Sequence, residues 1–293
     1  MRYFLILVLL FTCANSFGKN FFNSTISDES LKLEESSFFS RATVKDSLIF
    51  SSEKIDFLNT YLLDSSVINS TSKDIGFTAS SLTFFQLQDI RNKRISLRNT
   101  YWNYGKLLNV DVENLLIELS HIKAIYIKNL NSSLFSLLRS TIYLTEFRNS
   151  KLLEINFQNI KINKSTFIDV SLVSGKMYKG SMSGGKWNIS HFENIKLSHF
   201  KFNNVEFKGN EISNNSHLVH VHFNGSDLES TQFKNTKLEN VIFNKVNSLG
   251  LTFTDCELRN VNFVGVKMGL IEFENTNLYK VFVDGKPYKP SVN

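Results

Sequence analysis

Proline and cysteine are nearly absent from this sequence, and glycine is not abundant. The 293 residues include 2 proline, 2 cysteine and 13 glycine residues, against 27 phenylalanine residues. Few prolines and many aromatic residues favour extended β-structure. With so little cysteine, stability must come from side-chain packing. The composition therefore predicts an all-β protein whose fold depends on a packed core.

The sequence also lacks a long hydrophobic run. Residues 1–16 begin with a basic end, continue with a short apolar stretch and finish with small or polar residues. This is the layout of a secretory signal, and it is too short to span a bilayer. Two kinds of processing fit: cleavage after Ser16, or lipid attachment at Cys13, because Leu10-Phe11-Thr12-Cys13 resembles a bacterial lipobox. We therefore expect an exported protein, either an envelope lipoprotein anchored to a membrane through Cys13 or a soluble periplasmic or secreted protein.

Neither sign of charge dominates the chain. Lysine and arginine number 33 and aspartate and glutamate 27, for a net charge of +6. Loss of Arg2 with the signal would leave 32 basic against 27 acidic residues, a net charge of +5. This small positive net charge permits contact with anionic surfaces without requiring it. Processing would also leave Cys256 as the only unmodified cysteine, so we expect no intramolecular disulfide.

A hydrophobic residue recurs every five positions over most of the chain. The series runs from Phe57 to Ile212, then resumes one residue out of phase at Leu218 and continues to Val283. The residue two before each of these centres is usually small or β-branched, and neither set contains a charged residue although 20% of the chain is charged. Two inward residues in every five fit a chain that turns a corner after each short extended segment. The residue two after each centre is often one that tolerates positive φ, as at Asn59, Asn99, Asn240 and Gly265.

Segments such as Thr236-Lys237-Leu238-Glu239-Asn240 resemble the repeat of the pentapeptide-repeat family, which places a small residue two before a central Leu or Phe. The resemblance covers residues 55–285. It implies a right-handed quadrilateral β-helix, a solenoid of about 11 coils with 20 residues in each coil. The coil length can be tested within the sequence, because the polar centres Ser72, Asn92 and Ser132 occur at intervals of 20 and 40. All three should therefore fall on one side of the coil.

Segments outside the regular pattern have expected places. Residues 17–54 break the five-residue rule and are predicted to cap the first coil, since open solenoid ends expose backbone and core. A register slip is expected at residues 213–217. The tail 286–293 should close or leave the other end.

Charged residues also follow the coil length. Basic residues are each followed 20 positions later by an acid, which predicts three ion pairs between neighbouring coils: Arg91 with Asp111, Lys93 with Glu113, and Arg98 with Glu118. Such a ladder accounts for the basic run without a nucleic-acid partner, and none is expected.

Residues 180–186 nearly spell a phosphate-binding loop, with Lys186 preceded by Gly185. The Ser or Thr that such a loop needs is replaced by Trp187, which cannot bind magnesium. Gly175, Gly180 and Gly185 each lie two before a bulky centre. We therefore interpret these glycines as packing positions that make room for large neighbours.

Histidines gather at the register slip, where His217, His220 and His222 occur together. If the extra residue forms a bulge, His199 lies one coil below His220. His199, His220 and His222 are the candidates for a metal site or a pH-sensing pair. Because no carboxylate or thiol accompanies them in the pattern, we favour ordinary surface residues.

No motif in the sequence supports catalysis or a cofactor, and a solenoid filled with Phe and Leu has no room for a substrate. We therefore predict a non-enzymatic interaction or structural protein that presents a rigid surface to an unidentified protein partner. One alternative is a secreted effector that acts on a host cell or membrane. Another follows from the family resemblance, because some pentapeptide-repeat proteins protect DNA gyrase by mimicking DNA. The positive charge and the export signal argue against it.

Overall fold

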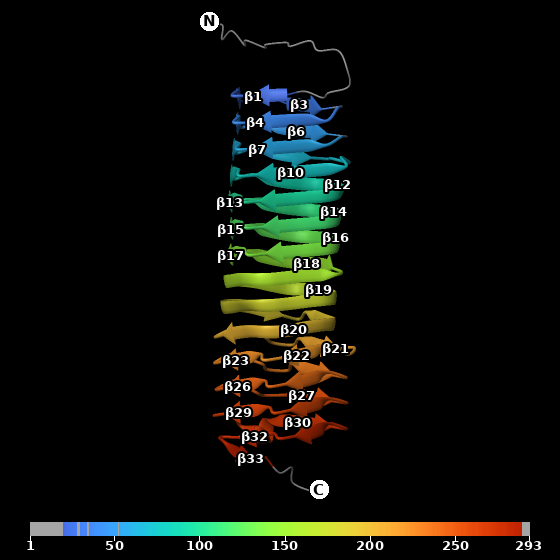
Figure 1. The fold of residues 1–293 in the computed structure, drawn as a ribbon, viewed down its shortest axis with the longest axis vertical. Helices are drawn as coiled ribbons and strands as arrows, with labels where there is room; N and C mark the ends of the chain where they lie inside the picture. The colour runs from blue at the N-terminus through green and yellow to red at the C-terminus, as the bar shows by residue number, and fades with distance from the viewer. Residues whose placement is uncertain (1–19, 28–29, 34, 52, 289–293) are drawn as a thin grey trace, which may run out of the picture.

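The computed structural model describes residues 20–27, 30–33, 35–51 and 53–288. Within these ranges all β-strands belong to one sheet, and the only helical segment there is the 3-10 turn η1 (Met268–Leu270). Figure 1 shows the strands stacked as coils of a straight rod, with β1 and β33 at opposite ends. The expected signal 1–16, including Cys13, lies outside the described residues. In the described ranges no helix has the length and apolar character needed to cross a membrane.

Parallel pairing of each strand with the strand one coil later builds the central part of the rod. Ile75 lies opposite Ile55, and Arg98 lies opposite Glu118. The predicted all-β solenoid with 20-residue coils is therefore confirmed. The strands of this part are β7 (Ile55–Leu58), β8 (Tyr61–Leu63), β9 (Ser66–Ile68), β10 (Asp74–Thr78), β11 (Ser81–Thr83), β12 (Gln86–Arg98), β13 (Tyr101–Asn103), β14 (Lys106–Glu118), β15 (His121–Lys123), β16 (Tyr126–Leu138), β17 (Thr141–Tyr143), β18 (Glu146–Leu152), β19 (Ile155–Asn188), β20 (His191–Asn203) and β21 (Glu211–Ser213).

Residues in the left-handed conformation make the corners of the coils. Asn59 and Asn99 both have a φ of 49°, and most other corner residues, two after each centre, also have positive φ. Asparagine suits this conformation because its side chain can hydrogen-bond to the local backbone. One corner of the central coils differs, since Arg94, Asn114 and Leu134 lie inside the unbroken strands β12, β14 and β16. The chain bends there without a left-handed residue, which is why these strands are long.

The first coils have a shorter repeat than the rest. Asn20 pairs with Phe38 and Ser37 pairs with Ile55, so the ladder advances there by an 18-residue repeat. Eighteen is not a multiple of five, which explains why this segment breaks the five-residue rule. These coils lie where a cap of residues 17–54 was expected, and the count of about 11 coils is corrected to about 13. Their strands are β1 (Asn20–Phe22), β2 (Thr25–Ser27), β3 (Ser30–Leu33), β4 (Ser37–Ser40), β5 (Thr43–Lys45) and β6 (Leu48–Ser51).

Beyond the first coils the register changes once along the described part of the rod. Glu193 pairs with Ser213 at a spacing of 20, but Lys196 pairs with His217 at a spacing of 21. The extra residue sits at Asn214 and Asn215, two consecutive residues with φ of 55° and 62°. The five-residue pattern slips at this place.

Beyond the slip the original spacing returns, as in the pair His217 and Lys237. At the end of the rod, β33 turns back and pairs antiparallel with β32. The strands of this part are β22 (His217–Val219), β23 (His222–Asn224), β24 (Gln232–Lys234), β25 (Lys237–Glu239), β26 (Ile242–Asn244), β27 (Leu251–Thr254), β28 (Glu257–Arg259), β29 (Asn262–Val264), β30 (Ile271–Glu274), β31 (Asn277–Tyr279), β32 (Phe282–Val283) and β33 (Lys286–Pro287).

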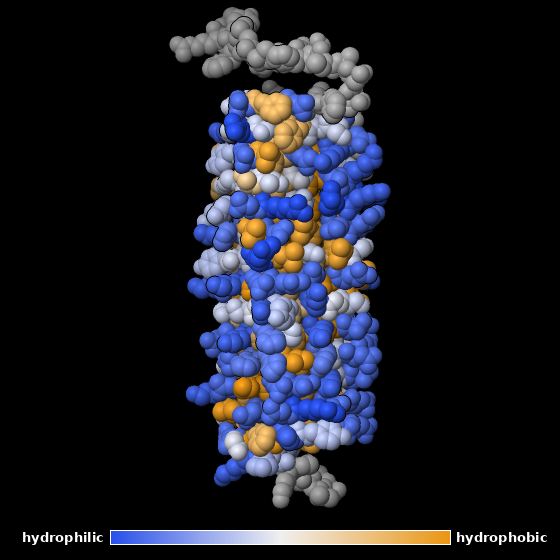
Figure 2. Space-filling view, viewed as in Figure 1, coloured by the Kyte–Doolittle hydropathy of each residue, from blue (hydrophilic) through white to orange (hydrophobic). Residues whose placement is uncertain are grey.

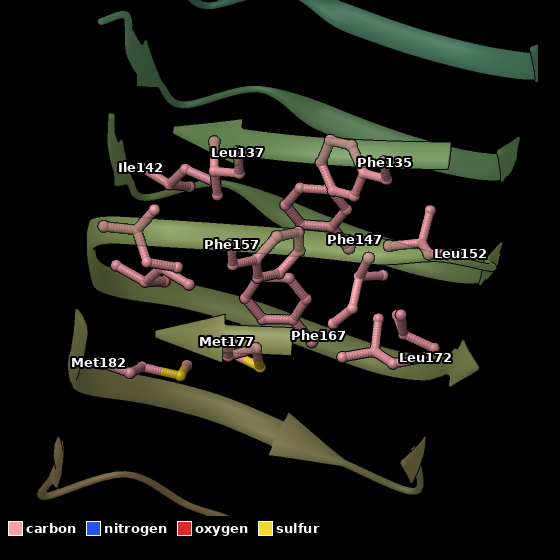
Figure 3. Packing of buried hydrophobic residues seen from close by; sticks show 14 of the residues in the cluster. Phe135, Leu137, Ile142, Phe147, Leu152, Phe157, Phe167, Leu172, Met177 and Met182 are labelled. Carbon is pink, nitrogen blue, oxygen red and sulfur yellow. The ribbon is translucent and has the colours of Figure 1, made fainter. Parts of the chain in front are cut away.

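Stacked side chains fill the interior of the rod. Phe167 lies between Phe147 and Trp187, with ring centroids 4.6 Å and 4.3 Å away. Figure 3 shows the buried rings and aliphatic side chains of successive coils meeting along the axis. Where two neighbouring coils both carry a ring at the same inward position, coil stacking places one ring over the other at a distance suited to stacking. The core is therefore continuous along the rod.

The second inward position of each repeat joins the coils by hydrogen bonds where it is Ser or Thr. The Ser80 hydroxyl accepts a hydrogen bond from the Thr60 backbone N–H at 3.2 Å and donates to the Thr78 carbonyl at 3.0 Å. Ser120 makes the same two contacts with Thr100 and Glu118. A small hydroxyl residue is suited to this position because it satisfies its own polar group inside the rod.

Candidate binding surfaces

The glycines of the segment that resembles a phosphate-binding loop lie within β19 and serve packing. Gly180 makes room for a large neighbour as predicted, because a Cβ there would lie 2.5 Å from the Phe200 ring. Gly185 and Gly175 serve packing for a different reason. Gly185 has a φ of +92°, and a Cβ atom there would lie 2.7 Å from the backbone nitrogen of Ser165 and closer still to its carbonyl oxygen. Gly175, with a φ of +128°, meets the backbone of Ile155 in the same way. The backbone of the preceding coil therefore excludes a side chain at both positions.

Only one of the three predicted ion pairs forms. Arg98 Nε lies 3.7 Å from Glu118 Oε2, and Glu118 also contacts Arg139 at 2.9 Å. Arg91 lies opposite Asp111 in the ladder, but in the described part of the chain no ion pair joins them, and none joins Lys93 to Glu113. Arg94 pairs instead with Asp74 at 2.9 Å. Pairs this exposed contribute at most about 1 kcal/mol each.

A shallow polar groove of about 520 Å³ crosses the coils beside Arg91 and Asp111. A ladder of amides and one carboxylate lines its edge. Asn129 donates a hydrogen bond to Asn109 at 2.8 Å, and Asn109 donates to Asp89 at 2.8 Å. The hydrogen bond from Asn109 and another from Gln88 lower the pKa of Asp89. These side chains form most of their hydrogen bonds with one another, which favours a role in joining the coils.

The histidines come together at the register slip. The ring centroids of His199 and His220 are 4.9 Å apart on one corner of the rod, and His217 and His222 lie on the two adjoining sides. Burial, with nearby lysines, lowers the pKa of His217 and His222 below that of an ordinary histidine. Among the described residues no three His, Cys, Asp or Glu side chains are grouped so as to hold a metal ion.

Cys256 is a core residue. It is 2% exposed, and its thiol lies 3.2 Å from the carbonyl oxygens of Phe233 and Thr254. Burial raises its pKa to about 11. The thiol is therefore protonated near neutral pH and is not a ready nucleophile.

Exposed aromatic side chains form a surface that the sequence analysis did not identify. Figure 2 shows hydrophilic residues over most of one view of the rod, with separate hydrophobic patches. One group of large apolar residues lies on and beside the side formed by β8, β11, β13, β15 and β17, and each member is 42–53% exposed. We call this group the aromatic patch; it consists of Tyr61, Phe84, Tyr101, Tyr104, Leu119 and Leu144.

The aromatic patch is ordered by the coil spacing. Tyr101 stacks on His121 in the next coil, with ring centroids 5.0 Å apart and an interplanar angle of 9°. Phe84 stacks on Tyr104 at 5.5 Å, and the Lys123 ammonium lies 5.7 Å from the Tyr104 ring centroid. Phe84 and Tyr104 occupy corners with φ of 53° and 55°, a conformation that bulky residues seldom adopt. The signal in the sequence was the recurrence of aromatic residues one coil apart at outward positions.

Comparisons with known proteins support the repeat assignment. A family model described as pentapeptide repeats (8 copies) matches residues 214–244. The match confirms the resemblance seen in the sequence. No curated protein matches the chain.

Several solved structures are similar to the chain at low identity. Tailspike protein 3 of bacteriophage CBA120 has 10% identity and a TM-score of 0.40, over 95% of this chain and 53% of that protein. QnrB1, a plasmid-mediated fluoroquinolone resistance protein, has 12% identity and a TM-score of 0.30, over 90% and 93%. The pentapeptide repeat protein Rfr23 of Cyanothece 51142 has 19% identity and a TM-score of 0.21, over 34% and 64%. The chain thus spans about half of the tailspike and under two thirds of Rfr23. Because the TM-scores are below 0.5, these similarities indicate nothing about function.

Proposed function

We propose that this pentapeptide-repeat rod is a non-enzymatic interaction protein that binds a protein partner through the aromatic patch. The observation that supports the proposal is the set of exposed rings held in register on a rigid sheet, with Tyr101 53% exposed. Tyrosine and phenylalanine are enriched at the centres of protein interfaces, and rigid side chains lose little entropy on binding.

The backbone conformation at the patch supports the same proposal. Most corners elsewhere carry residues that accept positive φ readily, such as asparagine or glycine, whereas Phe84 and Tyr104 do not. Retaining aromatic side chains there costs stability. A binding role would explain why they stand where asparagine would be better for folding.

The filled interior supports a role for the outer surface. Phe167, Trp187 and the other stacked rings occupy the axis of the rod, so a ligand can meet the chain only on its sides or ends. A flat, repeating outer surface suits the binding of another macromolecule better than the enclosure of a small substrate.

Export to the bacterial envelope, or beyond the cell, is part of the proposal and rests on the sequence of residues 1–16 alone. Lipid attachment at Cys13 would tether the rod to a membrane, whereas cleavage after Ser16 would release it. In either case the aromatic patch, which begins at Tyr61, belongs to the mature chain.

The test is recovery of a cross-linked partner in the native host. The double variant Phe84→Ser/Tyr104→Ser is expected to reduce recovery of the complex at least about tenfold, because loss of two central aromatic contacts costs more than about 1.4 kcal/mol. The control is Lys164→Ser/Lys245→Ser, which changes residues with φ of 48° and 50° on the same corner outside the patch. If the patch variant gave as much complex as the unsubstituted chain, this surface would be ruled out. It would also be ruled out if the control variant lost as much complex as the patch variant.

A further inference from the structure

Lysines and histidines gather at outward positions around one edge of the rod near the register slip. The edge lies between the side that carries Lys196 and the side that carries Lys201, with His199 at the corner between them. Three successive coils place nine residues there. We call them the basic strip: Lys176, Lys179, Ser181, Lys196, His199, Lys201, His217, His220 and His222.

Strand register aligns the basic strip along the rod axis. Lys176, Lys196 and His217 form one column of paired residues. Ser181, Lys201 and His222 form a second column on the adjoining side. The corner between the columns carries Lys179, His199 and His220, and the last two rings are in contact. Lysines, or histidines that can gain a proton, therefore recur about every 4.8 Å along the axis, the spacing of neighbouring strands.

Several cations elsewhere on the rod form ion pairs with acidic residues of the next coil. Lys186 pairs with Glu206 at 2.9 Å, and Lys208 pairs with both Asp227 and Glu229. In the part of the chain that the structure describes, the four lysines of the strip have no ion pair. The nearest carboxylate contact is His217 to Glu239 at 3.6 Å. Like charges stacked on adjacent strands repel one another, so this arrangement lowers stability until an anion covers it.

We propose that the basic strip binds an acidic polysaccharide, a linear sugar chain that carries carboxylate or sulfate groups. A linear polyanion fits because the charged groups gather around one edge over three coils and do not cover a whole side of the rod. Neutral hydrogen-bonding groups lie beside them, since Asn224 donates to Asn203 at 2.9 Å and Asn203 lies 3.5 Å from the Ser183 hydroxyl. Amides and hydroxyls of this kind can bind sugar hydroxyls.

The surroundings of the strip favour a sugar over a nucleic acid. Single-stranded nucleic acids bind through bases stacked on exposed aromatic rings. The aromatic side chain at the strip is Tyr178, which is half-buried and has the Lys179 ammonium 5.0 Å from its ring centroid. His199 covers its edge from the next coil. Tyr178 is therefore not open to a base.

The histidines make the charge of the basic strip depend on pH. His217 faces Lys196, Lys237 and Glu239, and His222 faces Lys201 and His220. His199 contacts Tyr178 and His220. Burial, with the neighbouring cations, lowers the pKa of His217 and His222, so both are neutral at pH 7 and gain a proton at lower pH. Because an anion favours the protonated forms, affinity rises as the pH falls.

The experiment measures binding of the full chain to fluorescent dextran sulfate and to polygalacturonate by anisotropy, at pH 7.5 and 5.5 in constant salt. Dextran sulfate keeps its charge across this range, so any change comes from the protein. Binding is expected to tighten at least about tenfold at the lower pH. Lys196→Gln/Lys201→Gln should weaken binding at least about tenfold at either pH.

Matched variants and probes decide the outcome. Lys106→Gln/Lys128→Gln removes the same charge from exposed lysines on another side and should weaken binding less than about threefold. Equal weakening by both pairs would overturn the proposal, since net charge would then explain binding. Tighter binding of single-stranded DNA or of anionic lipid vesicles than of both polysaccharides would also overturn it, and weak binding of neutral dextran would support it.

Discussion

Replacing Phe243 with aspartate is expected to lower the free energy of unfolding by at least about 4 kcal/mol. Phe243 is 0% exposed and stacks between Phe223 and Phe263, with ring centroids 5.2 Å and 4.9 Å away. Phe233 and Phe253 meet it edge to face. The substitution removes these contacts and places a carboxylate among apolar rings, where it can be hydrated only if the coil opens. Chemical denaturation of the full chain measures the loss.

Lys245→Asp is the matched control two residues away. Lys245 is exposed at a corner with a φ of 50°, a conformation that aspartate accepts. Its replacement should change the free energy of unfolding by less than about 1 kcal/mol. If Lys245→Asp destabilised the chain as much as Phe243→Asp, the assignment of inward and outward positions would be wrong.

Alanine at Gly185 is expected to destabilise the rod by at least about 3 kcal/mol, whereas alanine at Gly184 should cost only about 1–2 kcal/mol. Both glycines have positive φ, but a Cβ at Gly184 would have only the Lys164 side chain within reach, at 3.8 Å. A Cβ at Gly185 would collide with the backbone of Ser165. Backbone atoms inside a parallel ladder cannot move aside without breaking the pairing of two coils.

Denaturation of the two variants under identical conditions measures this difference. The comparison also tests why the segment resembles a phosphate-binding loop. If the two substitutions had equal effects, close approach between coils would not explain the glycine at position 185.

The five-residue period, together with the family resemblance that it supported, predicted the fold, because nearly all inward positions from Phe57 to Val283 carry uncharged side chains suited to a packed interior. It could not predict the first coils. Their 18-residue spacing, seen where Ser37 pairs with Ile55, is not a multiple of five. Parallel pairing and a shared core hold these coils in the rod all the same, and Phe39 stacks on Phe57 at 4.7 Å.

The surfaces were harder to predict than the core. Opposite charges one coil apart predicted three ion pairs. Long exposed side chains can reach several partners, however, and Glu118 also forms an ion pair with Arg139. The histidines were recognised at the register slip, yet their lysine neighbours were not. Lys196 and His217 are paired across the slip at a spacing of 21 residues and not 20. Their common column can therefore be predicted only if the position of the bulge at Asn214 and Asn215 is known.

The aromatic patch and the basic strip both depend on the coil register, which one cross-linking measurement tests directly. Arg98 and Glu118 are paired residues on adjacent strands, so their Cα atoms should lie about 5 Å apart, within the range of a disulfide. Arg98→Cys/Glu118→Cys, in a chain with Cys13→Ser and Cys256→Ser, is expected to form a disulfide under mild oxidation. Arg98→Cys/Asn114→Cys, four residues out of register, should not. A disulfide in the second variant and none in the first would contradict the 20-residue coil and the surfaces built on it.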